Sequence, residues 1–466
     1  MCKQTPHDGQ APVRLPPSSY DAEEGRQNAD QLYSQGWDHF DRRQLLRAQE
    51  CFEAALRVYQ QYDQDGFLSV ACCRMSIGCI YQQQGKLDDA LNSHSRALET
   101  FEWLEPDSLN AAASYNNLAL VYQDLGRFSD ALNLYSKSRV IKERLVPDSL
   151  DLAMTYNNIG NVYQSQGKLA LALEMHDKTR AIRERLAPES LDMASTFTNT
   201  GNVLLTQGRF TEALALYERG RQIQERLAPE SLDLAHTYNN VGIILEEQGR
   251  FEEALWMHTQ SRHLKQTVTP DSLHLASTFN NIGVVLFHQE KYQDALQMYD
   301  AALDIQQRVG PDTLDLAFTL NNIGELYLVA MGDLSRAWDL FHRACEIIEK
   351  HAPASPEYGD VLRNIGNVLK AQGLLNQALR IQQQARDLLE DCVPGSPVLA
   401  KTLRDMAEIL QQQGSLTEAL ELIESCLSIL SQPHIGISHK QHPVYLKAKH
   451  QQMGLAAVLV HNDSVS

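Results

Sequence analysis

The stretch TYNNIGNVYQSQGKLALALEMHD, Thr155 to Asp177, carries the signals that decide the fold. Its apolar residues from Tyr156 to Tyr163 follow the three- and four-residue spacing of one helix face. Gly167 interrupts this pattern, and a second apolar stripe starts at Leu169. The stretch therefore predicts two helices joined by a tight turn.

The same pair of helices recurs along the chain with a period of about 41 residues. Prolines follow one another at steps of 41 or 42 residues from Pro106 to Pro394, and turn glycines keep this period from Gly85 to Gly414. Glu290 replaces the turn glycine once, and an alanine follows each turn by five residues. About ten units therefore fill residues 28–432.

Stacked helix pairs predict an all-α fold, a right-handed superhelical α-solenoid of about ten pairs. Residues 1–27 are rich in proline and are expected to be disordered, ahead of the array at residues 28–432. Residues 433–466 break the repeat. They predict a linker, a helix that caps the array and a short tail.

Small residues and charges predict the packing inside each unit. Gly160 in the first helix and Ala172 in the second predict a close approach of the two helices. Asp148, after the linker proline, is the expected N-cap of the first helix. Glu143 and Arg144, in the second-helix motif IKERL, are expected on a solvated outer face.

Composition limits the classes of function. The chain has 466 residues, 43% of them hydrophobic, and a formal net charge of −18. This acidic balance argues against nucleic-acid binding, which needs neutralisation of phosphate charge. No apolar run approaches the roughly 18 residues of a membrane span, and the N-terminal sequence lacks the apolar core of a secretory signal. The eight cysteines form no Cys-x-x-Cys pair, which favours reduced thiols and a cytoplasmic location.

The repeat resembles the tetratricopeptide repeat. That motif places a large residue, a Leu-Gly pair, a tyrosine, a turn glycine and a small alanine at fixed offsets, and the matching residues are Tyr156, Ile159, Gly160, Tyr163, Gly167 and Ala172. The usual period is about 34 residues, and roughly seven more add about two helical turns without rotating the packing faces. HEAT repeats have a similar length but lack this glycine and alanine pattern.

Within that family, the segment YNNLALVYQDLGRFSDALNLYSKSRVIKERLVPDSLDLA resembles the long repeats of kinesin light chains and nephrocystin-type proteins. The shared features are the Asn-Asn pair, Leu-Ala, Tyr, Gly-Arg-Phe and the Pro-Asp linker, and the resemblance covers about 400 residues. A kinesin light chain carries a long heptad segment before its repeats. Residues 1–27 are too short for one, so we expect a relative rather than a kinesin light chain itself.

An asparagine pair stands at the same point of the first helix in most units, as at Asn157 and Asn158. Asparagine is unfavourable inside a helix because its amide competes for backbone hydrogen bonds. On a wheel of about 100° per residue, Asn158 lies almost opposite the packed face of Tyr156 and Tyr163. First helices line the concave surface of such a solenoid. The second asparagines therefore predict an asparagine column along the groove: Asn117, Asn158, Asn199, Asn240, Asn281, Asn322 and Asn364.

We expect this column to bind the backbone of an extended peptide, because an amide carries both donors and an acceptor. At roughly 10 Å per helix layer, the members of the column are too far apart to bond to each other. The resembling families imply the same backbone-clamping role. Alternatively, the amides bond to the adjacent repeat or cap its turns. We favour this second interpretation for the first members of the pairs: Asn116, Asn157, Asn239, Asn280 and Asn321.

Further side chains on the predicted groove extend the candidate site. Three asparagines follow the column residues by three positions: Asn161, Asn202 and Asn367. Positive charge is predicted toward both ends of the column, at Arg74, Arg363, Lys370 and Arg404. The alternative for each of these is a solvated surface charge. The layout fits a partner segment in which acidic residues flank an apolar core.

No catalytic or metal-binding motif stands out. His94, His176 and His258 recur every 82 residues, too far apart to share a metal ion, and alternate with tyrosines such as Tyr135. We expect half-buried, aromatic-like packing for them. The sequence lacks a phosphate-binding glycine loop, a His-Glu-x-x-His motif and a nucleophile elbow. Neither a cofactor nor a metal is expected.

The predicted function is a non-enzymatic scaffold or adaptor that binds an extended segment of another protein in its groove. Two alternatives stay open, a regulatory subunit or signalling switch controlled by partner binding, and a cargo adaptor like a kinesin light chain. Because a backbone clamp is nearly independent of side chains, the sequence leaves the partner, the pathway and the oligomeric state open.

Overall fold

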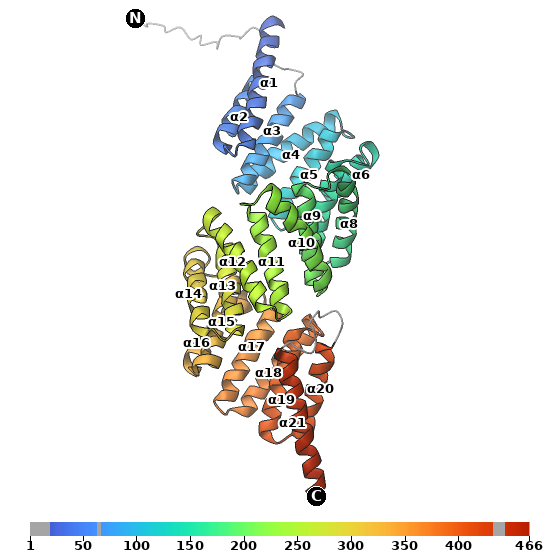
Figure 1. The fold of residues 1–466 in the computed structure, drawn as a ribbon. Coiled ribbons are helices and arrows are strands. Elements are labelled where there is room, and N and C mark those ends of the chain that lie inside the picture. Colours follow the sequence, from blue (N-terminus) through green and yellow to red (C-terminus); the bar gives the residue numbers. More distant parts are fainter. Residues whose placement is uncertain (1–18, 63–66, 432–442, 466) are drawn as a thin grey trace, which may run out of the picture. The chain divides into compact units, whose positions relative to one another are not determined.

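The computed structural model describes residues 19–62, 67–431 and 443–465, which form ten helix pairs, a last helix and no strand (Figure 1). The predicted all-α solenoid of helix pairs is confirmed. The chain divides into two compact units, Met1–Leu186 and Ala187–Ser466, and each is described by itself. In the described residues, no helix combines the length and the apolar character needed to cross a membrane.

The first unit contains four helix pairs. Their bounds are α1 Ser19–Asp41, α2 Leu45–Tyr62, α3 Phe67–Gln83, α4 Leu87–Leu104, α5 Leu109–Asp124, α6 Phe128–Leu145, α7 Leu150–Ser165 and α8 Leu169–Leu186. Residues 19–27, which we assigned to the disordered segment, therefore belong to the first helix. The rest of that segment, residues 1–18, lies outside the described residues.

The second unit contains six helix pairs and the last helix. Their bounds are α9 Leu191–Thr206, α10 Phe210–Leu227, α11 Leu232–Glu247, α12 Phe251–Val268, α13 Leu273–His288, α14 Tyr292–Val309, α15 Leu314–Leu326, η1 Tyr327–Met331, α16 Leu334–His351, α17 Pro356–Ala371, α18 Leu375–Cys392, α19 Pro397–Gln413, α20 Leu416–Leu430 and α21 Pro443–Val465. The element η1 is a π-helix. The predicted linker falls in residues 432–442, outside the described residues.

Glycines in the left-handed conformation turn the chain between the two helices of a pair. Gly167 has a φ of 71°, and Lys168 N–H after it donates to the Tyr163 carbonyl at 2.9 Å. A residue without a Cβ adopts this conformation without strain. Glu290 occupies the same position with a φ of 60°, so one turn is made by a residue that disfavours it.

Serine or threonine, rather than aspartate, caps the first helices. The Ser149 hydroxyl accepts from Leu152 N–H at 3.1 Å. The prediction that Asp148 is the N-cap is therefore wrong by one residue. Asp148 instead pairs with Arg185 of the next second helix at 2.6 Å. A carboxylate one residue before the cap is free to reach outward because Ser149 already satisfies the helix terminus.

The two helices of a pair approach each other closely where a glycine of the first helix lies against an aromatic or histidine ring of the second. A Cβ on Gly160 would lie 2.7 Å from the His176 ring, so Gly160 lies against His176 and not against Ala172 as predicted. His94, His176 and His258 are fully buried rather than half-buried. Their predicted role as packing side chains is confirmed, because each fills the space beside a glycine of the first helix.

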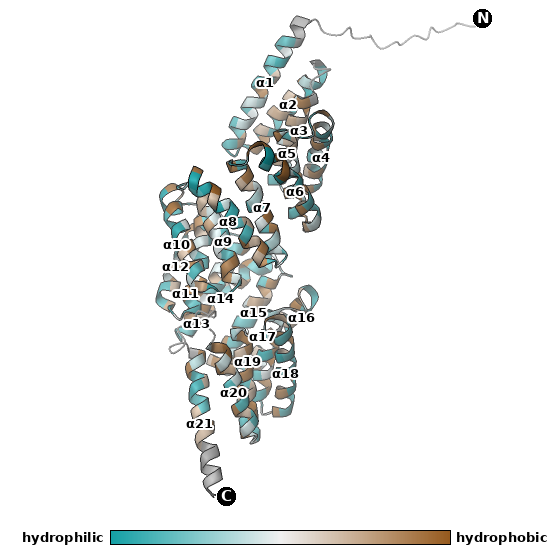
Figure 2. Cartoon of the chain, turned by 90° about the vertical axis from the view of Figure 1, so that its right-hand side faces the viewer, coloured by the Kyte–Doolittle hydropathy of each residue, from teal (hydrophilic) through white to brown (hydrophobic). Residues whose placement is uncertain are grey.

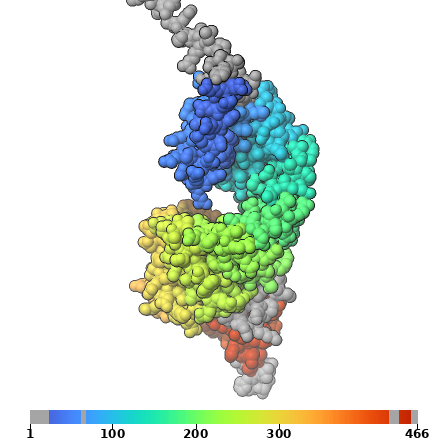
Figure 3. Space-filling view, turned by 45° about the horizontal axis from the view of Figure 1, so that its top comes forward, coloured from blue at the N-terminus to red at the C-terminus, as the bar shows by residue number. Residues whose placement is uncertain are grey.

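Most helices carry one hydrophobic and one hydrophilic side, as the alternating colours of Figure 2 show. The hydrophobic sides bury tyrosines, alanines and aliphatic residues between neighbouring helices. In the space-filling view, α11 to α14, coloured yellow-green to yellow, form one continuous packed surface (Figure 3). The core is therefore repeated from pair to pair instead of being gathered at one centre.

Second helices tie each pair to the next one. Lys142 is buried, and its ammonium donates to the Asp151 carbonyl at 3.3 Å and to Thr155 Oγ1 at 3.1 Å. The prediction of a fully solvated IKERL face is therefore wrong at Lys142. It is confirmed at Arg144, which is 56% exposed in its pair with Asp107.

Candidate functional site

Side-chain amides link the first helices of successive pairs in the second unit. In each link, the Nδ2 amide of the second asparagine donates to an amide oxygen of the preceding pair. The bonds run from Asn240 to Asn202 at 2.9 Å, from Asn281 to Asn239 at 3.1 Å, from Asn322 to Asn280 at 3.1 Å and from Asn364 to Asn321 at 2.9 Å. The asparagines thus form a ladder between repeats.

The first unit has a looser version of this ladder. Asn158 donates to Asn116 at 3.5 Å, and the Asn117 amide lies 3.8 Å from Cys79 Sγ. Contact of the first asparagines with the adjacent repeat, which we favoured, is confirmed at Asn116, Asn239, Asn280 and Asn321. Within the described residues, none of these bonds joins two members of the column, as predicted, but most column asparagines bond to other asparagines of the preceding pair instead of being left entirely to a peptide. Except at Asn240, which donates to Asn202, the bond runs diagonally, from the second asparagine of one pair to the first of the preceding pair.

The ladder leaves part of the amide available at the exposed members of the column. An asparagine side chain has two N–H donors and an oxygen acceptor, and the bond to the preceding pair uses one donor. Asn240, Asn281 and Asn322 are partly exposed. Asn158 and Asn364 are buried, at 9% and 1% exposure, so these two hold the helices together more than they face solvent.

The remaining predicted residues lie in both units. In the first, Arg74 on α3 and Asn161 on α7 are partly exposed. In the second, Asn199 is partly exposed, and Asn202 accepts from the Tyr217 hydroxyl at 2.6 Å as well as from Asn240. The other four, Asn367, Arg363, Lys370 and Arg404, come together at one place in the second unit.

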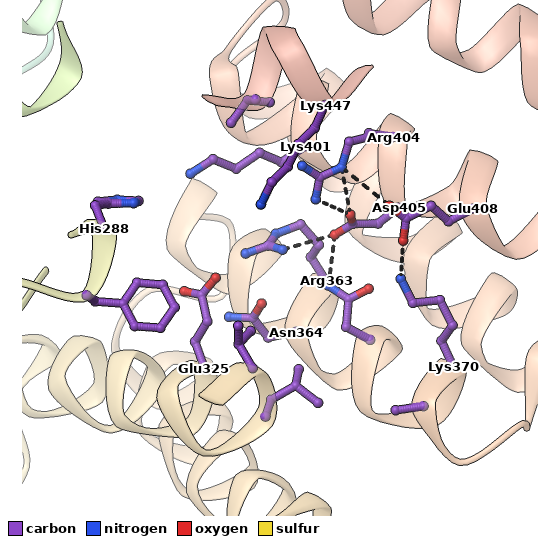
Figure 4. Close-up of a pocket in the computed structure, with 16 residues that line it drawn as sticks. His288, Glu325, Arg363, Asn364, Lys370, Lys401, Arg404, Asp405, Glu408 and Lys447 are labelled. Atoms are coloured by element: carbon purple, nitrogen blue, oxygen red, sulfur yellow. Dashed lines mark hydrogen bonds and ion pairs between the residues drawn. The ribbon is translucent and has the colours of Figure 1, made fainter. Parts of the chain in front are cut away.

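That place is a cavity of about 350 Å³ (Figure 4). It opens between the C-terminal halves of α13, α15 and α17, with α19 and the start of α21 beside them. Its lining residues are Phe287, His288, Glu325, Leu328, Val329, Arg363, Asn364, Asn367, Lys370, Ala371, Lys401, Arg404, Asp405, Glu408, Val444 and Lys447.

A second cavity, of about 340 Å³, lies over the N-terminal halves of α15 and α17. Its lining residues are Phe318, Asn321, Asn322, Pro356, Glu357, Asp360, Val361 and Val398. Asn322 therefore faces one cavity and Asn364 the other. Two members of the asparagine column border open space on the same group of first helices.

A buried ion network includes lining residues of both cavities, Asp360 of the second and Arg363 and Asp405 of the first. Arg363 contacts Asp360 at 2.9 Å and Asp405 at 3.0 Å, and the side chains of Arg363 and Asp405 are only 6% and 2% exposed. Arg404 contacts Asp405 at 2.7 Å, and Asn367 donates to the same carboxylate at 2.8 Å. Asp405 stands 41 residues after Asn364, so it takes the place of the next column asparagine.

The network neutralises its own charges. Burial by itself would raise the pKa of the Asp405 carboxyl, but Arg404 and Arg363 hold it below its usual value. Lys370 likewise contacts Glu408 at 2.5 Å. Three of the cations predicted to attract a partner are therefore already paired inside the chain.

Three other charged side chains of the cavity have no such partner. Among the described residues, no hydrogen bond or ion pair joins Lys401, Lys447 or Glu325 to another side chain. Lys401 and Glu325 reach into the same space from α19 and α15 (Figure 4). The cavity thus holds two lysines and a glutamate that form no direct ion pair with any described residue, and Lys401 and Glu325 act on neighbouring charges at longer range.

Acidic residues on α11 belong to the same electrostatic environment. Burial, with a smaller effect of Glu247, raises the pKa of Glu246 to about 8, and Lys401 opposes this shift. Burial also raises the pKa of Glu247, against the effect of Lys401. Glu246 therefore takes up a proton more readily than an ordinary glutamate, and Lys401 is the cation that limits this.

Sequence reasoning missed the unpaired charges and the apolar wall of the first cavity. A signal for one of these charges was present, because Glu325 stands three residues after Asn322, where other units have asparagine or an aliphatic residue. In the paired network, Asp405 likewise departs from the column asparagine. Nothing local marked Phe287, Lys401 or Lys447, because only the packing of helices distant in sequence brings them together.

Comparison with known proteins finds one repeat family along most of the helix pairs. The model of a tetratricopeptide repeat family matches residues 69–144, 110–185, 151–226, 192–266, 274–350 and 357–432. No curated protein matches the chain. Several solved structures do.

The apo form of the quorum sensor NprR from B. thuringiensis has 16% sequence identity and a TM-score of 0.61, covering 79% of this chain and 99% of that one. BtubC (BKLC) from P. vanneervenii has 23% identity and a TM-score of 0.43, covering 48% of this chain and 91% of that one. A putative kinesin light chain from Podosopora anserina, with nearly identical TPR-like repeats, has 20% identity and a TM-score of 0.37. The match covers 43% of this chain and 98% of that one.

The NprR likeness concerns the fold, which is a solenoid of helix pairs in both proteins. The family matches extend across most of the described helix pairs, and their spacing agrees with the period of about 41 residues. Together with the turn glycines and the paired helices, they show that the chain belongs to the tetratricopeptide repeat family.

Proposed function

We propose that this chain is a non-enzymatic scaffold that binds an extended segment of a partner protein across its first helices. The observation that carries the proposal is the position of Asn322, a partly exposed column amide that borders the second cavity, beside the first cavity on the same group of first helices. Tetratricopeptide arrays present such helix faces as binding surfaces. The site belongs to the second unit, where ladder bonds hold the amides in fixed orientations.

The ladder supports this function by preorganisation. Asn322 already donates to Asn280, so its remaining donor and its oxygen are held in one orientation. A partner backbone that bonds to a fixed amide loses less entropy than one that must first order it. Because the amide contacts the backbone, the binding tolerates different side chains of the partner.

The unpaired charges of the first cavity add selectivity. Lys401 and Lys447 favour acidic residues of the segment, and Glu325 disfavours them nearby. The apolar residues Leu328 and Val329 lie beside them. An acidic segment with an apolar centre, as inferred from the sequence, is consistent with these residues. Within this proposal the protein acts in the cytoplasm, where its seven described cysteines stay free thiols.

The test compares two double variants that break the same ladder bonds. Asn281→Ala with Asn322→Ala removes amides from the groove, whereas Asn239→Ala with Asn280→Ala removes only their acceptors in the preceding pair. Both forms and wild type are used for affinity capture from lysate, with quantitative mass spectrometry. Urea unfolding gives the stability of each.

We expect the first double variant to lose partners about tenfold while the second keeps them, although the second also loses the bond between Asn239 and His258 and should be the less stable of the two. Equal loss in both would show that the amides act only by holding repeats together, and the proposed contact would be wrong. Recovery of a single partner in fixed stoichiometry would favour the regulatory-subunit alternative. Co-purification of a kinesin heavy chain would favour the cargo-adaptor alternative.

A further inference from the structure

One helix pair of the array contains an additional residue. Gly332 follows Glu290 by 42 residues, whereas Glu290 follows Gly249 by 41. The additional residue does not lengthen the turn. Helix α15 stops after 13 residues, and the five residues Tyr327–Met331 continue as a π-helix, which we call the π turn.

Neighbouring first helices stay α-helical at this point. Helix α13 before it and α17 after it both have 16 residues of α-helix. A π-helical turn accommodates one more residue within the helix, at the expense of backbone hydrogen-bond geometry, and such turns are frequent at functional sites. The insertion therefore changes the surface that the helix presents without changing the fold.

The π turn forms one wall of the first cavity. Leu328 and Val329 line it, together with Val444 at the start of α21 and Phe287 of α13. Val329 is 59% exposed, although an aliphatic side chain gains free energy from burial. Met331 belongs to the same π turn and is 45% exposed, but it does not line the cavity.

We infer that the π turn is the specificity element of the groove, and that Leu328 and Val329 form a subsite for one bulky apolar side chain of the bound segment. The inference rests on the proposed function, because it names the partner residue which that groove selects. The volume of about 350 Å³ is ample for a leucine, phenylalanine or tryptophan side chain. Burial of Val329 under such a side chain removes its exposure to water.

Three variants test whether the π turn binds a partner side chain or only fits the additional residue into the helix. Deletion of Ala330 restores the 41-residue step and is expected to turn the segment into an α-helix. Val329→Ser removes the apolar wall but leaves the backbone unchanged. Met331→Ser is the matched control, because it makes the same kind of change on the same π turn outside the cavity. Circular dichroism and urea unfolding establish that all three fold.

The probe is a random dodecapeptide library displayed on phage, selected against the full chain. Wild type is expected to enrich peptides with a large apolar residue at one fixed position. Synthetic copies of these peptides should bind Val329→Ser about tenfold more weakly and the Ala330 deletion at least as weakly, with less than about twofold change for Met331→Ser. Replacement of the fixed apolar residue by serine in the peptide should weaken binding to wild type by a similar factor.

Other outcomes overturn the inference in distinguishable ways. If peptides are enriched and depend on Asn281 and Asn322 but bind Val329→Ser normally, the subsite is wrong and the proposed function stands. If wild type enriches no peptide, both are wrong. If wild type self-associates in sedimentation velocity and Val329→Ser is monomeric, the occupant is a second copy of the chain, and the partner subsite is wrong.

Discussion

The side-chain oxygen of Asn239 accepts a hydrogen bond from Asn281 Nδ2 at 3.1 Å and lies 3.2 Å from His258 Nδ1. One amide oxygen thereby joins the first helix of a pair to its own second helix and to the first helix of the next pair. The bond with His258 requires the proton on Nδ1. This explains why an asparagine, unfavourable inside a helix, is present at Asn239: its bonds are made between helices.

Asn239→Ala should destabilise the second unit by about 2 kcal/mol, because two buried or half-buried donors lose their common acceptor. Asn281→Ala should cost less, about 1 kcal/mol, since only one bond is lost. Urea unfolding of both single variants and of the double variant measures the coupling between the two residues. Strictly additive effects would show that the bond contributes nothing to stability.

Glu290→Gly should stabilise the chain by about 1 kcal/mol. A residue with a Cβ is strained at the φ of 60° that Glu290 adopts, and glycine is not, although glycine gains entropy in the unfolded chain. The urea midpoint of unfolding measures the change. Gly249→Ala, at a φ of 72°, is the control of opposite sign and should destabilise by a similar amount. A lower midpoint for Glu290→Gly would mean that Glu290 makes a contact worth more than its strain.

His176→Tyr should make the first unit less sensitive to acid. Burial, with a smaller effect of Arg183, lowers the pKa of His176 from 6.5 to about 4. The unfolded chain thus binds a proton more readily than the native one between about pH 6.5 and pH 4, and stability falls with decreasing pH by about 1.4 kcal/mol per pH unit for each such group. Tyrosine already fills this position at Tyr135 and Tyr217.

The free energy of unfolding, measured in urea from pH 4.5 to 7, tests this prediction. The variant should show a shallower decrease toward low pH than wild type. His263→Tyr, at an exposed position of α12, serves as the control and should leave the slope unchanged. A steep decrease that persists in His176→Tyr would show that other groups dominate the acid response.

Asp405→Asn should destabilise the second unit by about 3 kcal/mol, although it restores the asparagine found at this point in other pairs. Arg363 and Arg404 would lose the carboxylate that they share in a buried site. The native pKa of Asp405 lies below its unfolded value, so the ionised carboxylate stabilises the wild-type fold above about pH 4. This stabilisation is lost from wild type as the pH falls further.

Unfolding of Asp405→Asn and wild type at pH 7 and at pH 3 measures this difference. The two proteins should differ strongly at pH 7 and less at pH 3. Asp387→Asn on the exposed side of α18 is the matched control, with an expected effect below about 1 kcal/mol because its pair with Arg386 is exposed. An equal difference at both pH values would show that Asp405 acts by its shape and not by its charge.

The local signals of the sequence determined the helix pairs. Apolar spacing, turn glycines such as Gly167 and linker prolines such as Pro147 act within one or two helical turns. Their regular recurrence predicted the number of pairs, the all-α fold and the repeat family. The errors inside a unit were small shifts, from Asp148 to Ser149 for the cap and from Ala172 to His176 for the contact of Gly160.

The relations between repeats were decided only by the tertiary structure. The bond from Asn281 to Asn239, the pairing of Arg363 with Asp405 and the cavity beside the π turn all join residues of different helix pairs. A helix wheel gives the direction of a side chain but not the distance to the next helix, which close packing sets. The sequence therefore predicted which asparagines face the groove. Only the packed helices showed that these amides donate to asparagines of the preceding pair, that three of the predicted cations are already paired, and that Lys401 and Val329 are left to face open space.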